Sequence, residues 1–274
     1  MNFYSLENLT KKYSKWTDAI KRDSKYCGIG TVNNRVKIQH GQILEQPCED
    51  RSFSFELKDG EIYAYAVIDG FNGTWVVDFL EQFLLSNLYF DHLSDLSIKS
   101  NEEINDLLIK EFFDAERYLS EQSQETLAKR ASINIHLANL NKRCPEYAEK
   151  IEELKMLNDD LTIGAYAVVS LIVNDRLFVT NLGTSHCFVC VYDKSNREKK
   201  VITLETEHSL RNLSEIQRLI NLKADVKEYD YDSSPSIKHS RCFGDFYSKY
   251  FFYENPQFDT VTKNYFYIRT QFYN

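Results

Sequence analysis

The residues best placed for chemistry in this chain form a short acidic and glycine-rich turn. Asp69 and Gly70 end a run of strand-forming residues, and Gly73 follows three positions later. Carboxylate and main-chain carbonyl oxygens are the ligands that hard cations such as Mg²⁺ prefer. Asp69 is therefore a candidate metal ligand. A structural alternative is that Asp69 caps the helix expected to begin near Thr74, by accepting hydrogen bonds from its free N–H groups.

The elements that must position this turn can be read from the apolar pattern around it. Residues 62–68 are rich in aromatic and β-branched side chains and predict a buried strand. Trp75, Phe79, Leu80 and Phe83 recur at helical spacing and predict a helix over 74–85 with these side chains inward. Upstream, residues 51–57 alternate like a half-buried strand, and the Lys-Asp-Gly at 58–60 predicts a hairpin turn into the next strand.

The remaining elements alternate between long helices and closely spaced strands. Asn101 is expected to cap a helix, with helical character to 143, a break at Pro145 and a charged helix over 147–157, forming a projecting hairpin. Residues 33–50 are interpreted as a loop. Segments 164–173, 176–181 and 186–192 predict an antiparallel meander, followed by a strand over 201–204 and a helix over 214–222. Residues 250–253 and 265–268 read as loop or strand. This grouping indicates an α+β fold.

Composition excludes several classes of function. The net charge is −8 and the basic residues are scattered, which argues against a nucleic-acid partner. No apolar run reaches the length of a membrane span, and charged residues near the N-terminus argue against a signal peptide, so we expect a cytoplasmic protein. Its six cysteines are then expected to be reduced. The Cys187–Cys190 pair lacks a second pair, so ordinary thiols are expected instead of a zinc site.

Several landmarks in order resemble the type 2C metal-dependent protein phosphatases. The family pattern Asp-Gly-His-Gly-Gly corresponds to Asp69–Gly73, and its preceding Glu-Asp pair to Glu49–Asp50. Further similar segments are Thr162–Ala167, Gly183–His186, Glu207–Leu210, Glu215–Leu219 and Ser240–Phe246. The match is strongest to a catalytically silent branch of kinase-binding adaptors, through segments such as Leu127–Ser132, Asn174–Thr184 and Leu210–Leu219.

The resemblance implies an architecture. It is a sandwich of two antiparallel sheets flanked by helices, here lacking its C-terminal portion. The implied division is an N-terminal extension at 1–26 and a phosphatase-like domain at 27–274, with a helical insert at about 101–158.

The resemblance also implies that the ancestral chemistry is missing. Type 2C enzymes use several carboxylates to hold two Mn²⁺ or Mg²⁺ ions that activate a water. Asp69, the Gly70 carbonyl and Asp50 match part of that set, so we expect a vestigial metal site, weak binding of Mn²⁺ or Mg²⁺, no required cofactor and no catalytic residue. Phe71 replaces the family's His, and Thr184 replaces an Asp. The family's phosphate-gripping Arg and its later acidic motifs have no counterpart.

The expected function is therefore that of an inactive phosphatase-like adaptor. The implied partners are a MAP kinase kinase kinase of the TGF-beta-activated type and an inhibitor-of-apoptosis protein. The alternative is an active Mn²⁺- or Mg²⁺-dependent Ser/Thr phosphatase, favoured by Asp69 and by Glu49–Asp50; a phosphopeptide-binding module would need an Arg cluster that the sequence does not show. His208 is expected to be a loop residue instead of a general acid. Arg241 is expected to pair with Asp245.

Overall fold

The computed structural model describes residues 35–39, 42–46, 48–57, 61–91, 97, 99–221, 240–253 and 269–273. The expected N-terminal extension at 1–26 and the strand expected at Cys27–Gly30 lie outside the described residues. The expected domain boundaries stay predictions.

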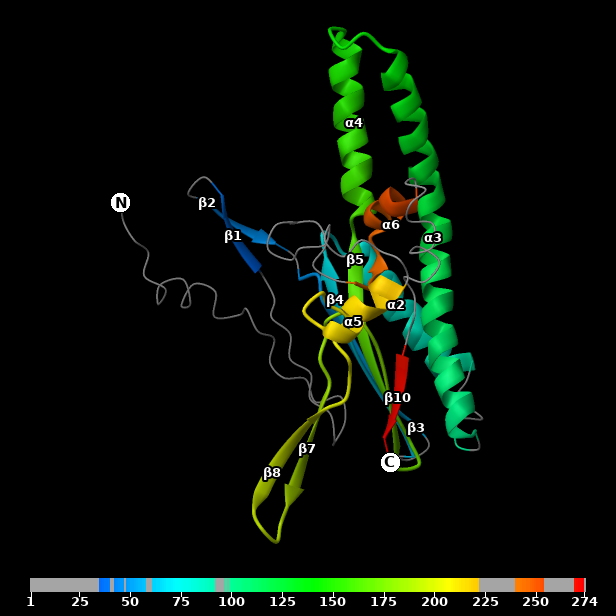
Figure 1. Cartoon of the computed structure of the whole chain (residues 1–274), viewed down its shortest axis with the longest axis vertical. Coiled ribbons are helices and arrows are strands. Elements are labelled where there is room, and N and C mark those ends of the chain that lie inside the picture. Colours follow the sequence, from blue (N-terminus) through cyan, green and yellow to red (C-terminus); the bar gives the residue numbers. More distant parts are fainter. Residues whose placement is uncertain are drawn as a thin grey trace, which may run out of the picture.

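The centre of the molecule is an antiparallel sheet with the strand order β10-β6-β5-β4-β3 (Figure 1). Side chains of β4 alternate as the sequence predicts, with Ile62, Ala64, Ala66 and Ile68 buried and the intervening residues on the other face. A short strand, β9, pairs with the start of β5. The strands are β3 (Arg51–Leu57), β4 (Ile62–Phe71), β5 (Gly164–Val173), β6 (Arg176–Leu182), β9 (Phe243–Gly244) and β10 (Arg269–Tyr273).

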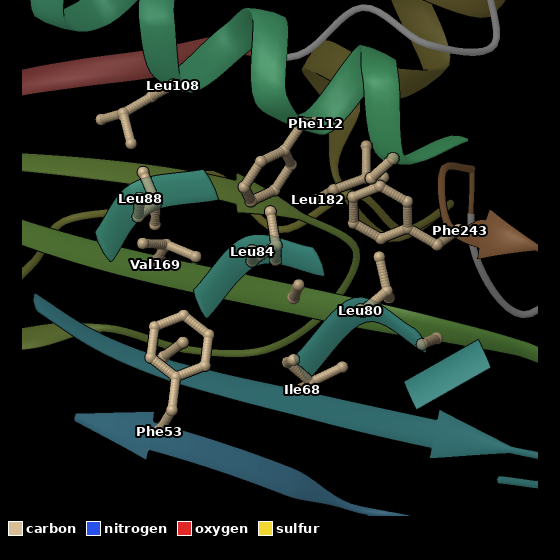
Figure 2. Close-up of a cluster of buried hydrophobic side chains, with 14 of the residues drawn as sticks. Phe53, Ile68, Leu80, Leu84, Leu88, Leu108, Phe112, Val169, Leu182 and Phe243 are labelled. Carbon is tan, nitrogen blue, oxygen red and sulfur yellow. The ribbon is translucent and has the colours of Figure 1, made fainter. Parts of the chain in front are cut away.

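Helices cover one face of this sheet and enclose the main core. Helix α2 (Trp75–Ser86) and a π-helical turn, η2 (Asn87–Asp91), lie between the sheet and the long helix α3 (Figure 2). Helix α2 packs on the core through Val76, Val77, Leu80 and Leu84, which are fully buried, and through Trp75, Phe79 and Phe83, which are partly buried. Small aliphatic side chains fit the gap between sheet and helix, and the larger rings are displaced to its margin.

The expected helical hairpin is present. It consists of α3 (Asn101–Asn139) and α4 (Pro145–Leu161), and its far end projects from the body (Figure 1). The N-cap of α3 is Ser100, one residue before the predicted Asn101. Ser100 and Glu103 form a capping box, with the Glu103 N–H donating to the Ser100 hydroxyl at 3.2 Å and the Ser100 N–H donating to the Glu103 carboxylate at 2.7 Å.

Two further antiparallel hairpins differ from the sequence-based expectations. Residues 33–50, interpreted as a loop, contain β1 (Arg35–Gln39) paired with β2 (Gln42–Gln46). The third strand of the expected meander, β7 (Phe188–Asp193), pairs with β8 (Glu198–Thr203) and not with β6. Gly183, with φ of 110°, redirects the chain after β6 and separates the two strands.

The C-terminal part also departs from the expectation. Residues 250–253, read as loop or strand, belong to helix α6 (Phe246–Tyr253). Asp245 begins this helix, because its carboxylate accepts a hydrogen bond from the Ser248 N–H at 3.3 Å. Helix α5 (Leu213–Asn221) agrees with the helix predicted over 214–222, and β10 pairs with β6.

The predicted α+β class, with antiparallel sheets flanked by helices, is confirmed. On the sheet face opposite α2 and α3, the base of the β7–β8 hairpin packs on Val168 and Val179 through Val189 and Ile202. Within the described residues, no helix is both long enough and apolar enough to cross a bilayer.

Candidate metal centre

The structure brings the two acidic segments to the same end of the central sheet. The β3–β4 ladder ends with Arg51 opposite Ile68, so Asp50 lies one position further on, beside Asp69. The main chain at Gly70 is in close contact with its neighbours. A Cβ added to Gly70 would overlap the Glu49 carbonyl oxygen and lie 2.7 Å from Val77 Cγ1. Glycine at this position therefore allows the Glu49–Asp50 main chain to approach the Asp69 turn. The three candidate ligands are neighbours.

Two aromatic residues, Tyr166 on β5 and Phe71 on β4, are neighbours of Asp69 on the same face of the sheet. In the β4–β5 ladder Asp69 lies opposite Tyr166, so both side chains stand on the same face of the sheet. Phe71 is two residues further along β4 and shares that face. The Phe71 and Tyr166 rings are in contact, with centroids 5.1 Å apart. A Cβ on Gly164 would lie 2.5 Å from the Phe71 ring. Phe71 is thus packed over the start of β5, next to the carboxylate.

The structural alternative for Asp69 stays a prediction. Asp69 lies inside strand β4, and the N-cap residue of α2 is Thr74, whose side chain makes no cap hydrogen bond. Asn72 also holds the turn: it lies in the left-handed region with φ of 64°, and its side chain donates to the Thr162 carbonyl at 3.1 Å. Asn is among the residues that tolerate this conformation.

Arg51 has a structural partner. Its Nε lies 2.7 Å from Asp78 Oδ1 on α2, and its Nη1 donates to the carbonyls of Cys48 and Asp50 at 3.0 and 2.8 Å. Arg51 therefore fixes the main chain before β3 to the first turn of α2. This arrangement positions Asp50 through its backbone.

A second polar cluster surrounds Glu215 of α5. Arg241 pairs with Glu215, and Ser240 and Arg218 also donate to Glu215 at 2.6 and 2.9 Å. The expected pairing of Arg241 with Asp245 stays a prediction. Burial alone would raise the pKa of Glu215, but the hydrogen bonds and charge of Arg241, with help from Ser240 and Arg218, lower that pKa to about 2. The Glu215 carboxylate therefore links α5 to residues 240 and 241, which precede β9, and stabilises their packing.

His208 belongs to the same cluster and is a structural residue, as expected. Its Nδ1 accepts a hydrogen bond from the Gly183 N–H at 3.0 Å, and the side chain is buried. Burial, reinforced by the nearby charge of Arg241, lowers the pKa of His208 to about 3. The neutral imidazole fixes the turn that follows β6.

The donor set at the Asp69 end suits one weakly held cation better than a pair of ions. It offers the carboxylates of Asp50 and Asp69 and the carbonyl of Gly70, and two hard cations need several more oxygens. Among the residues that the structure describes, no three His, Cys, Asp or Glu side chains come together in a metal-binding group. When bound in a type 2C site, Mn²⁺ or Mg²⁺ supplies an activated water and neutralises phosphoryl charge.

Sequence reasoning missed two participants in these sites. Tyr166 was not predicted to face Asp69, because helices α2, α3 and α4 lie between β4 and β5 and no local turn sets the register of these two strands. Glu116 of α3 is also buried, where it accepts from the Gly244 N–H at 3.0 Å and pairs with Lys249 at 2.9 Å. No local signal distinguishes Glu116 from the many exposed acids on the same helix.

The antiparallel sheet with its covering helices and the order of the sequence landmarks define a phosphatase type of domain. The chain belongs to the protein phosphatase 2C family, whose model matches residues 44–265. A curated relative described as probable protein phosphatase 2C 40, from Arabidopsis thaliana, is 25% identical over 158 residues, which cover 57% of this chain and 32% of the relative. The chain therefore spans about a third of the length of that curated relative.

Solved structures with a related fold include two protein phosphatases. A serine/threonine phosphatase from Staphylococcus aureus is 14% identical, with a TM-score of 0.43, covering 77% of this chain and 65% of that chain. A serine-threonine phosphatase 2C from Toxoplasma gondii is 13% identical, with a TM-score of 0.45, covering 82% and 69%. No residue role is taken from likenesses this distant.

Proposed function

We propose that this phosphatase 2C domain is a catalytically inactive adaptor that binds a kinase. The observation that carries the proposal is the environment of Asp69. Its neighbours on the same sheet face are Phe71 and Tyr166, whose rings contact each other. Aromatic carbon provides no ligand for a hard cation, and a packed ring leaves little room for the hydration shell that Mg²⁺ keeps. This environment supports the proposal that the dinuclear centre of the family does not assemble around Asp69.

Two substitutions in the sequence support the same proposal. Phe71 stands where the family pattern has His, and Thr184 stands where it has Asp. Both replacements remove a group that can carry charge or a proton. Asp50 beside Asp69 is the observation that favours the alternative, an active Mn²⁺- or Mg²⁺-dependent Ser/Thr phosphatase, but two carboxylates hold at most one ion weakly.

The proposed partner follows from the resemblance to TGF-beta-activated kinase binding protein 1. The segment Asn174–Thr184 resembles a segment of that adaptor, including the Thr at position 184 in place of the family's Asp. The segment Leu127–Ser132, which lies in α3, also resembles the adaptor. We infer a cytoplasmic role in stress or immune signalling, in which the domain binds the TGF-beta-activated MAP kinase kinase kinase and an inhibitor-of-apoptosis protein.

A phosphatase assay tests the first half of the proposal. Phosphate release from a phosphothreonine peptide is measured with and without millimolar Mn²⁺, for the natural chain and for Asp69→Asn. We expect no Mn²⁺-dependent turnover in either protein, since the metal centre is incomplete. Turnover that requires Mn²⁺ and disappears in Asp69→Asn would establish the active phosphatase instead.

A pull-down tests the second half. The full chain is used as bait in a cell extract, and bound proteins are identified by mass spectrometry. We expect the TGF-beta-activated kinase to co-purify with the natural chain and with Asp69→Asn to the same extent, because binding does not use the metal site. Recovery of no MAP kinase kinase kinase would refute the kinase-adaptor role.

A further inference from the structure

The β7–β8 hairpin is an exposed two-stranded sheet with a free edge. Its base is anchored where Val189 and Ile202 pack on the central sheet, and its outer half reaches away from the body (Figure 1). In the part of the chain that the structure describes, β7 pairs with β8 only. Two-stranded hairpins are marginally stable in water, so a third strand would stabilise this one.

The outward side of this hairpin is apolar. Phe188, Tyr192 and Val201 are 55%, 52% and 62% exposed, and Cys190, opposite Val201, is exposed beside them. The opposite side is also uncovered toward the tip, where Val191 is 47% exposed. Both faces of the outer half can therefore accept side chains from an added strand.

The two strands of the hairpin differ in how their edges are protected. Natural proteins protect free edges with lysine, proline or a bulge. Strand β8 has Lys199 and Lys200 near its start, whereas β7 reads Phe-Val-Cys-Val-Tyr before its only charged residue, Asp193. The β7 edge is therefore the one open to pairing with another strand.

Charge selects the kind of strand. Residues 193–200 carry Lys194, Arg197, Lys199 and Lys200 against Asp193 and Glu198, a local balance of 4 − 2 = +2 on a chain whose net charge is −8. Lys199 lies opposite Tyr192 and Lys200 opposite Val191, so one cation extends on each face of the hairpin. A strand that alternates apolar and acidic residues, with its apolar side chains on the face of Phe188 and Tyr192, would place its acids on the opposite face, toward Lys200.

From these observations we propose that the β7 edge is a docking site for an extended acidic segment of a partner protein. The segment adds to β7 as a third strand through main-chain hydrogen bonds, while Phe188 and Tyr192 contact its apolar side chains and Lys200 attracts the carboxylates on its other face. The proposal is independent of whether the domain has phosphatase activity, because the edge lies on a separate hairpin from Asp69.

The test uses the full chain and two synthetic octapeptides that alternate valine with either glutamate or lysine. Affinity is measured by fluorescence anisotropy, and amide hydrogen exchange is followed across residues 188–193. The glutamate peptide is expected to bind and slow exchange in β7, and the lysine peptide to bind about fivefold more weakly, as one exposed charge pair allows. N-methylation of alternate amides in the glutamate peptide, which removes the strand donors, should abolish binding.

A charge-reversed variant supplies the control. The double substitution Lys199→Glu and Lys200→Glu should invert the preference toward the lysine peptide, whereas Lys142→Glu with Lys155→Glu, on the helical hairpin, should leave it unchanged. Equal binding of the N-methylated peptide, or unchanged exchange in β7, would overturn the proposal. So would strong protection of the β7 amides without peptide, since another part of this chain, or a second copy detected by sedimentation, would then already cover the edge.

Discussion

His208 illustrates how a catalytic residue type can have a structural role. The ring is buried, accepts from the Gly183 N–H, and lies near Arg241 and Arg218, whose charges oppose its protonation. The imidazole must therefore remain neutral for the turn after β6 to keep its geometry. The same turn presents Thr184 and leads toward the β7–β8 hairpin.

This environment predicts a pH dependence of stability. The pKa of His208 falls from 6.5 to about 3 in the folded protein, so the unfolded chain binds a proton that the folded chain excludes between these values. The contribution of His208 to the free energy of unfolding is complete above pH 6.5 and is lost as the pH falls toward 3. The loss is on the order of 3 kcal/mol by about pH 4. The variant His208→Asn keeps an acceptor for the Gly183 N–H but has no group that titrates in this range. The free energy of unfolding of this variant, measured by urea denaturation, should therefore depend less on pH. An unchanged profile would contradict this assignment.

At the scale of elements, the helical hairpin divides into a buried root and an exposed end. The main core takes buried side chains from α3 up to Leu119 and from α4 only at Leu161, and Leu127 of α3 packs against it partly buried. Beyond this root, α3 and α4 contact mainly each other, joined by pairs such as Arg130 with Asn158 at 2.9 Å. The projecting end is therefore predicted to contribute little to the stability of the body.

Truncation tests this division. Replacing residues 132–156 with a short glycine–serine linker retains Arg130 and Asn158, and we expect the free energy of unfolding to change by less than about 1 kcal/mol, since loop closure depends only weakly on length. Leu119→Ala, at the root, is expected to cost about 2–5 kcal/mol. Urea denaturation compares the two variants, and a severe loss on truncation would mean that the body depends on the projecting end.

At the scale of the whole molecule, one buried ion pair joins distant parts of the chain. Glu116 of α3 accepts from Lys249 of α6 at 2.9 Å and from the Gly244 N–H of β9, and Lys249 also donates to the Cys242 carbonyl at 2.9 Å. Strand β9 in turn pairs with Gly164 at the start of β5, which packs against Phe71. The Glu116–Lys249 ion pair thus connects the helical insert, the C-terminal elements and the candidate metal centre.

Removing one partner of this pair should be more harmful than removing both. Lys249→Met leaves the Glu116 carboxylate buried without its cation, at an expected cost of about 3–5 kcal/mol, whereas Glu116→Leu combined with Lys249→Met should recover part of the loss. A double-mutant cycle by urea denaturation measures the coupling. Equal stability of Lys249→Met and the natural chain would show that the Glu116–Lys249 ion pair does not stabilise the fold.

Local patterns were sufficient for much of the fold. Strands β3, β4, β5 and β6 and the helical hairpin agree with prediction because alternation and helical spacing are properties of neighbouring residues. The hairpin of β1 and β2 was missed, since short segments of mixed polarity carry a weak local signal. Helix α6 was missed because its run of aromatic residues is typical of a strand. The register between β3 and β4 followed from a predicted turn, and it was enough to bring Asp50 beside Asp69.

The sequence by itself determined the α+β class, the family landmarks and the loss of the His and Asp at positions 71 and 184. Only the tertiary structure decided that Phe71 and Tyr166 pack together beside Asp69, that Arg241 pairs with Glu215, and that β7 pairs with β8 alone among the described strands. These facts concern residues far apart in the chain. Their partners are chosen by burial and by competition among many possible pairs, which no short stretch of sequence records.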